Sequence, residues 1–154
     1  GKTLFHADHG NIGTAGAPSL TTFAEARQLM RRQTGLSGQP ISVTPRVVMV
    51  PPELETIAEK ELAEIAPARS EDVNPFAGAL SVVVEPRLAD TGRWYVTAAP
   101  SEIDGLEYAY LEGAPGPQIE SRNGFEVDGV QIKVRLDFGA GFVDWRGWFT
   151  NPGA

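Results

Sequence analysis

Hydrophobic residues recur at helical spacing in the first part of the chain. Residues 22–34 open with Thr22 and Glu25, whose side chains have the spacing of a capping box, and Gly35 follows as a stop signal. One face of this segment collects the apolar residues Phe23, Ala26, Leu29 and Met30. The spacing therefore predicts a helix over residues 22–34.

A second helical pattern follows directly after a short β-branched run. Val47–Val50 predicts a strand, which ends at Pro51 and Pro52 because proline lacks the backbone N–H that a strand uses. Proline fits the first turn of a helix, and Pro67 closes the pattern. The predicted buried stripe of this helix is Leu54, Ile57, Ala58, Leu62 and Ile65.

From residue 80 the hydrophobic period becomes two and stays so nearly to the end of the chain. The predicted strands lie within residues 80–88, 93–99, 106–112, 117–130 and 130–138. In the last of these, the apolar face consists of Val130, Ile132, Val134, Leu136 and Phe138. The alternation predicts a mostly antiparallel sheet with one solvent-exposed face and one face covered by the two helices, which is an α+β fold.

Composition and charge narrow the classes of function. A length of 154 residues with 42% hydrophobic residues suits a single domain over residues 1–154. No apolar run reaches the roughly 18 residues that cross a bilayer, and a formal net charge of -7 argues against nucleic-acid binding, which needs an excess of Lys and Arg. The absence of cysteine excludes thiolate metal sites, disulfides and cysteine nucleophiles.

Both histidines of the chain lie in the segment LFHADHGN, residues 4–11. His6, Asp8 and His9 can share a metal ion or serve a hydrolase where their segment is helical. Gly10 follows at once and disfavours a helix, so we predict a polar turn in which these side chains bond to the backbone. A hydrolase or metal-dependent enzyme that uses His6, Asp8 and His9 stays the alternative.

The tail of the chain places two tryptophans around an arginine. Trp145, Arg146 and Trp148 are of the residue types enriched at protein interfaces, which predicts a contact patch. The two tryptophans can equally cap the core at the end of the sheet, so both interpretations stay open. The nucleophile-elbow, dinucleotide and phosphate-loop motifs are absent, and no catalytic residue or cofactor is predicted.

Several separated segments, taken in order, resemble the C-terminal half of the Mu-like major head subunit family, the major capsid proteins of tailed phages and prophages. They are LFHADHGN, ARQLMRRQTGLSG, PRVVMVPPELE, NPFAGALSVVVEPRL, WYVTA and the run from LEYAYLE to VDWRG. The resemblance covers almost all of the 154 residues and joins many motifs in one order.

The resemblance implies an HK97-like major capsid fold. The chain would supply mainly the axial domain, with a central, mostly antiparallel sheet flanked by helices, plus part of the peripheral domain. It implies a structural protein without cofactor and without enzymatic activity, namely a subunit of the icosahedral head that encloses packaged DNA. The expected location is the virion capsid, and the cytoplasm of the bacterial host during assembly.

The same resemblance implies the partners. The full-length protein is expected to self-associate into pentamers and hexamers and to contact other head proteins, with no membrane and no specific nucleic acid among its partners. Residues 1–154 would be the C-terminal portion of a longer capsid protein, of a kind often fused to a prohead protease. Alone, they are expected to form a monomer or a weak oligomer, because the arm and loop that lock neighbouring subunits together would lie upstream.

Overall fold

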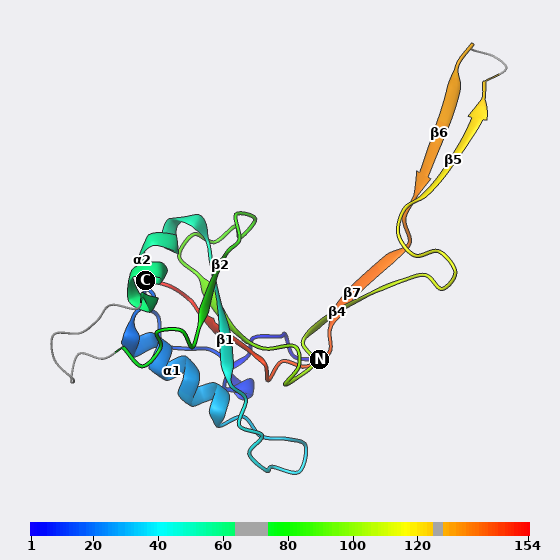
Figure 1. The fold of residues 1–154 in the computed structure, drawn as a ribbon. Coiled ribbons are helices and arrows are strands. Elements are labelled where there is room, and N and C mark those ends of the chain that lie inside the picture. Colours follow the sequence, from blue (N-terminus) through cyan, green and yellow to red (C-terminus); the bar gives the residue numbers. More distant parts are fainter. Residues whose placement is uncertain (64–73, 125–127) are drawn as a thin grey trace. The chain divides into compact units, whose positions relative to one another are not determined.

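The contacts within the chain divide it into two units. The computed structural model describes residues 1–63, 74–124 and 128–154. The first unit comprises residues 1–105 and 144–154, and the second comprises residues 106–143 (Figure 1). One domain over residues 1–154 stays a prediction, because a division by packing does not decide whether either unit folds without the other.

A four-stranded sheet in the order β2-β1-β3-β8 forms the centre of the first unit (Figure 1). Its strands are β1 (Pro45–Val50), β2 (Ser81–Val84), β3 (Trp94–Ala98) and β8 (Trp148–Asn151). The pairs β1–β3 and β3–β8 are antiparallel, as predicted, whereas β1 and β2 are parallel. The parallel pair departs from a simple meander because the chain crosses from β1 to β2 through a helix, as parallel strands require.

Strand β8 lies in a stretch for which the alternation predicts no strand. Phe149, Thr150 and Asn151 are all buried in succession, so the strand shows no alternation of apolar and polar residues. Its outer edge carries a parallel bridge between Ile12 and Thr150, which covers it with the N-terminal segment. A strand that is covered on every side lacks the period of two by which strands are predicted.

Helix α1 (Leu20–Arg31) begins and ends slightly earlier than predicted. Ser19, and not Thr22, is the N-cap: its Oγ accepts the Thr22 N–H at 3.2 Å, and Thr22 Oγ1 accepts the Ser19 N–H at 2.9 Å. The predicted capping partner Glu25 instead accepts the N–H of Thr14 at 3.1 Å. The capping box therefore exists, three residues nearer the N-terminus than Thr22 and Glu25 indicate.

The second helix starts where the two prolines predict it. A 3-10 turn η2 (Pro52–Leu54) leads into α2 (Glu55–Leu62). The residues of the predicted stripe that contact the core are Leu54, Ala58 and Leu62. The prediction that Ile57 belongs to this stripe is wrong, because Ile57 is 42% exposed. It is one residue from Ala58 and therefore projects about 100° around the helix from it. Ile65 and the predicted end at Pro67 lie outside the described residues.

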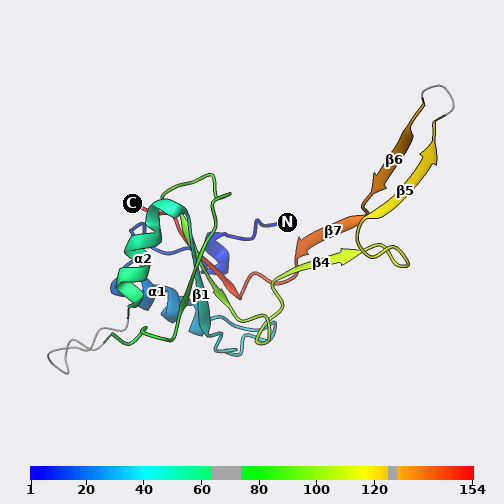
Figure 2. The same ribbon diagram turned by 45° about the horizontal axis from the view of Figure 1, so that its top comes forward.

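Both helices lie on the same side of the sheet (Figure 2). Their buried side chains and those of the sheet form one hydrophobic core. Trp94 of β3 is fully buried and meets Phe23 of α1 edge to face, with ring centroids 5.5 Å apart. Phe149 of β8 is also fully buried, with its centroid 6.0 Å from that of Trp94. Ala58 and Leu62 bring α2 to the same core.

The second unit consists of two antiparallel ribbons. β4 (Leu106–Tyr110) pairs with β7 (Phe138–Phe142), and β5 (Gln118–Asn123) pairs with β6 (Val130–Arg135). The sequence predicts β4, β5 and β6 as strands of the helix-covered sheet, and that placement is wrong. It predicts no strand over residues 139–142, where most of β7 lies. The apolar residues predicted to face the core are more than half exposed, namely Val130, Ile132, Val134, Leu136 and Phe138.

Gly153 provides a test of the packing at the end of β8. It has a φ of +87°, and an added Cβ would clash with the Gly92 backbone, whereas Gly38 has a φ of +80° with open space around it. We expect Gly38→Ala to lower the free energy of unfolding by about 1 kcal/mol through backbone strain alone. Gly153→Ala should cost at least about 2 kcal/mol more, because the backbone must also shift. Equal losses in urea denaturation would contradict this packing.

Glu85, directly after β2, provides a pH-dependent test. The Arg87 guanidinium donates to both carboxylate oxygens, at 2.7 and 2.6 Å, and lowers the pKa of Glu85 to about 2. A carboxylate whose pKa is lowered by folding adds stability above its unfolded pKa and loses it as the pH falls through the folded value. We expect an NMR titration to place the Glu85 pKa near 2, and Arg87→Gln to raise it toward the ordinary 4.5. An unchanged pKa in Arg87→Gln would exclude the ion pair as its cause.

Candidate functional site

The histidine-rich segment folds as a short turn. His6 is the N-cap of the 3-10 turn η1 (Ala7–His9), because its Nδ1 accepts the Asp8 N–H at 3.1 Å. The Asp8 carboxylate forms an ion pair with Lys2 Nζ, which lowers the pKa of Asp8. Gly10 closes the turn with a φ of 60°. The Asp8 side chain thus pairs with a lysine, and not with the backbone as predicted.

His9 is held by contacts on several sides. Its Nδ1 lies 3.1 Å from the Leu4 carbonyl oxygen, and its carbonyl oxygen accepts a hydrogen bond from Gln33 Nε2 at 3.0 Å. Its ring stacks on the Trp145 indole with centroids 4.1 Å apart and planes inclined by 6°. The ring therefore joins the N-terminal turn to the tail by packing.

The geometry of this turn gives the metal or catalytic alternative no support. The ring centroids of His6 and His9 are 5.7 Å apart, and each Nδ1 is within hydrogen-bonding distance of a backbone group. Within the described ranges, the structure contains no group of three His, Cys, Asp or Glu side chains that could hold a metal ion. The predicted polar turn is confirmed for both rings.

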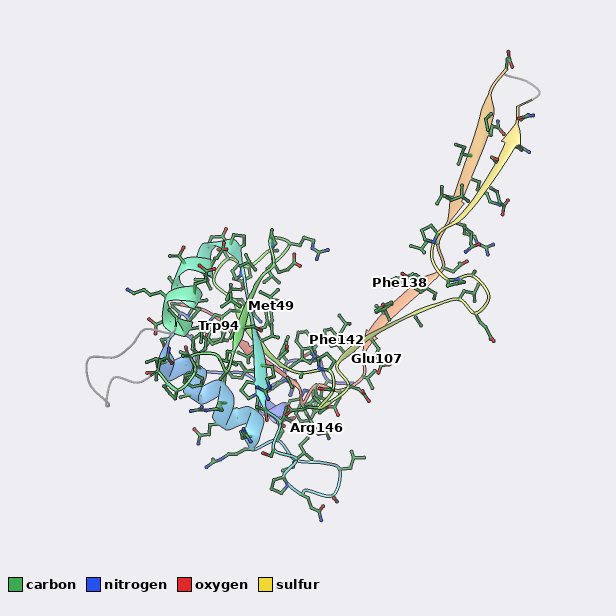
Figure 3. All side chains as sticks on the ribbon, in the orientation of Figure 1. Met49, Trp94, Glu107, Phe138, Phe142 and Arg146 are labelled. Atoms are coloured by element: carbon green, nitrogen blue, oxygen red, sulfur yellow. The ribbon has the colours of Figure 1, made fainter. Side chains whose placement is uncertain are left out.

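The tail residues pack inside the first unit. Arg146, which is labelled in Figure 3, contacts both carboxylate oxygens of Asp144 through its Nη1, at 3.1 and 2.9 Å. Its Nε donates to the Thr34 carbonyl oxygen at 2.7 Å. The guanidinium also lies 4.7 Å from the centroid of the Trp145 ring. Trp148 is half-buried beside Gly105, where an added Cβ would lie 2.7 Å from the indole nitrogen. These contacts agree with the capping interpretation, and an interface at Trp145, Arg146 and Trp148 stays a prediction.

The ribbon of β4 and β7 presents an apolar, largely aromatic face. Residues that pair directly across an antiparallel ribbon point to the same side, and the register pairs Tyr108 with Ala140 and Tyr110 with Phe138. The full apolar face consists of Leu106, Tyr108, Tyr110, Phe138, Ala140 and Phe142. The rings of Tyr108, Tyr110 and Phe138 contact one another, with centroids 5.7 to 5.9 Å apart. These three rings are nevertheless 43% to 67% exposed.

The opposite face of this ribbon has very different residues. It carries Glu107, Ala109, Gly139 and Gly141, which are small or charged. The two faces therefore differ sharply in hydrophobicity, and the aromatic one is the candidate functional surface. We call it the aromatic face.

The ribbon of β5 and β6 is divided in the same way. Ile119 pairs with Val134 on one face, which also carries Val130 and Ile132. On the other face Glu120 pairs with Lys133, with Oε2 and Nζ 2.7 Å apart, and this ion pair lowers the pKa of Glu120. The predicted alternation of apolar and polar faces is thus confirmed, although no helix of the second unit's described residues covers the apolar face.

Two-stranded ribbons with exposed apolar faces imply contacts beyond their own strands. An isolated two-stranded ribbon is marginally stable in water, and contiguous exposed apolar surface marks an interaction site. The sequence does not show whether such an apolar face is exposed or covered, because a face that packs on another molecule has the same alternation as a face that packs on the chain's own helices.

No described helix combines the length and the hydropathy that a bilayer crossing requires.

One solved structure shares the fold of the chain, and a second one is similar to a lesser degree. The holo-SrpI encapsulin complex from Synechococcus elongatus matches with a TM-score of 0.58 and 9% identity, over 92% of this chain and 52% of that one. The procapsid of satellite phage P4 with its size determination protein matches with a TM-score of 0.48 and 14% identity, over 86% of this chain and 38% of that one. The chain thus spans about half the length of the encapsulin subunit. The α+β, HK97-like fold is confirmed by the encapsulin match.

The sequence comparisons agree with this fold. No protein with curated annotation matches the chain. The sequence model of a family described as phage capsid protein matches residues 1–151, which is nearly the whole chain. The chain therefore belongs to the phage capsid protein family.

Proposed function

We propose that the chain is a structural subunit of the icosahedral head of a tailed phage or prophage, and that it assembles into the shell that encloses packaged DNA. The match of the phage capsid protein family to residues 1–151 carries this proposal. In this proposal the protein resides in the virion capsid, and in the cytoplasm of the bacterial host during assembly.

The surface chemistry of the second unit supports assembly over catalysis. An enzyme concentrates polar and titratable groups in a cleft, whereas this unit displays apolar side chains along exposed strands. Exposed aromatic and aliphatic residues are the groups that gain most when a neighbouring subunit covers them. In the turn around His6, Asp8 and His9, both Nδ1 atoms contact backbone groups and the Asp8 carboxylate pairs with Lys2, all within the first unit.

The finer parts of the proposal concern the whole protein. Residues 1–154 would be one domain, the C-terminal portion of a Mu-like major capsid protein, and would supply mainly its axial domain plus part of its peripheral domain. The longer protein would form pentamers and hexamers and contact other head proteins. Alone, the chain would be a monomer or a weak oligomer.

Electron microscopy tests the proposed function directly. The chain would be purified alone and, in parallel, joined to the sequence encoded in frame before it, and both forms would be viewed in negative stain and sized by chromatography. Shells, rings or tubes from the longer form would support the proposal. Small monodisperse particles from both forms would overturn it.

The aromatic face gives a matched pair of variants. Tyr108 and Glu107 are adjacent in β4 and lie on opposite faces of the ribbon, so each can be replaced by the same residue. We expect Tyr108→Lys to reduce the yield of assembled particles at least roughly tenfold, because a buried unpaired charge costs about 2 kcal/mol or more at an interface. Glu107→Lys should assemble nearly as the unchanged chain does. If the two variants assemble equally, the aromatic face is not a subunit contact.

Substitution of the histidines tests the enzymatic alternative. His9→Ala removes the stack on Trp145 and the contact with Leu4, and we expect it to lower the free energy of unfolding by about 1 to 2 kcal/mol in urea denaturation. His6→Ala removes one hydrogen bond at a partly exposed turn and should cost less. A stoichiometric metal ion in the unchanged chain that both variants lose, measured by elemental analysis, would instead revive the alternative.

A further inference from the structure

The outer edge of β5 has hydrogen-bonding groups that no described residue occupies. Among the residues that the structure describes, β5 pairs only with β6. The Gly124 N–H donates to the Gly129 carbonyl oxygen at 2.8 Å, so residue 124 points its backbone groups toward the partner strand. In an antiparallel pair this direction alternates, and the groups of Ile119, Ser121 and Asn123 therefore point outward.

The charges along β5 are complementary to a second, reversed copy of the same strand. Glu120 and Arg122 lie on the same face, two residues apart, on either side of Ser121. If two β5 strands pair in antiparallel fashion with Ser121 opposite Ser121, each Glu120 faces the Arg122 of the other copy. The outward groups of Ile119, Ser121 and Asn123 are then the ones that meet, as the hydrogen-bond pattern requires.

The neighbouring registers of the same pairing are electrostatically unfavourable. A shift by two residues in one direction places Glu120 opposite Glu120, and a shift in the other direction places Arg122 opposite Arg122. Like charges directly opposite destabilise a strand pair, whereas opposite charges stabilise it. A shift by one residue would bring inward-pointing backbone groups to the edge. The charge pattern thus selects the register centred on Ser121.

The outer edge of β6 lacks this complementarity. Its charged face has Gln131, Lys133 and Arg135 and no acidic residue. Two copies of β6 would place Lys133 opposite Lys133, Gln131 or Arg135, so no register gains an ion pair. Pairing of β5 with β6 of a second copy gains one ion pair, Glu120 with Lys133. It leaves one β5 edge and one β6 edge unpaired, so further copies can add without closing the assembly.

We propose that two copies of this chain pair through the outer edges of β5, antiparallel about Ser121, with reciprocal Glu120–Arg122 ion pairs. The contact is isologous and closes on itself. It turns two ribbons into a four-stranded sheet, which keeps the Val and Ile side chains of both copies on one face and the charged side chains on the other. The proposal rests on the proposed shell function, since it names one contact between the subunits of that assembly.

Single cysteines test the contact, because the chain has no cysteine of its own. Ser121→Cys places two thiols directly opposite each other, with Cα atoms about 5.5 Å apart, which suits a disulfide. Ile132→Cys is the matched control, since residue 132 pairs with residue 121 across the ribbon on the same face. In the proposed sheet two such β6 strands lie about 14 Å apart, too far for a disulfide.

After mild oxidation with diamide, we expect a disulfide dimer from Ser121→Cys and none from Ile132→Cys. Equal dimer from both variants, or none from Ser121→Cys, would overturn the proposal. A dimer that forms only when both cysteines are present in one chain would also overturn it, because it would show that β5 pairs with β6 of the second copy.

Charge exchange tests the register. The double variant Glu120→Lys with Lys133→Glu keeps the ion pair inside the ribbon but places a positive charge at position 120 opposite Arg122 of the other copy. In the Ser121→Cys background it should reduce dimer formation roughly fivefold or more. Adding Arg122→Glu restores opposite charges at both positions and should restore the dimer. If the yield of dimer is the same in all these variants, the proposed reciprocal Glu120–Arg122 ion pairs are wrong.

The pairing and the shell function can fail separately. Particles from the longer form that contain no Ser121→Cys disulfide would overturn the pairing and leave the shell function standing. Disulfide dimers in the absence of any shell, ring or tube would support the β5 pairing. They would contradict the proposal that this pairing is a contact between capsid subunits.

Discussion

The Trp94 side chain is the contact on which the arrangement of the first unit depends. It is fully buried in the central strand β3, and it touches Phe23 of α1 and Phe149 of β8. Its indole N–H donates to the Gly16 carbonyl oxygen at 2.9 Å, which satisfies the one polar group of this large side chain. One residue thus fixes a helix, the edge strand from the tail, and the loop that leads into the helix.

The N-terminal segment depends on two buried asparagines that complete this arrangement. Asn151 Nδ2 donates to the Thr14 carbonyl oxygen at 2.7 Å, and its Oδ1 accepts the Gly16 N–H at 3.0 Å. Asn11 does the same closer to the start, since its Nδ2 donates to the Leu4 carbonyl oxygen at 3.0 Å and its Oδ1 accepts the His6 N–H at 3.2 Å. These amides supply the hydrogen bonds that a segment with little regular secondary structure otherwise lacks. The polar residues of LFHADHGN are therefore explained by folding.

Local patterns predicted the elements of the first unit and missed its long-range pairings. The apolar spacing of Phe23, Ala26 and Met30 identified α1, because residues three or four positions apart in the sequence share one face of a helix. The stack of His9 on Trp145 joins residues at opposite ends of the chain, and no local pattern specifies such a partner. The sequence therefore indicated a turn at His6 and His9 but not the long-range contacts that stabilise it. It also left two interpretations of Trp145 open, which only the structure could compare.

In the second unit the sequence predicted which side chains share a face but not what lies against that face. Ile132 and Lys133 are on opposite sides of β6, as the period of two indicates, yet both are exposed. The first unit buries its apolar residues between a sheet and two helices, whereas the second has only ribbons two strands wide, which cannot enclose a core. Its apolar faces therefore gain burial only through groups outside the unit. In the proposed shell, neighbouring subunits would supply those groups, whereas the first unit encloses a hydrophobic core of its own.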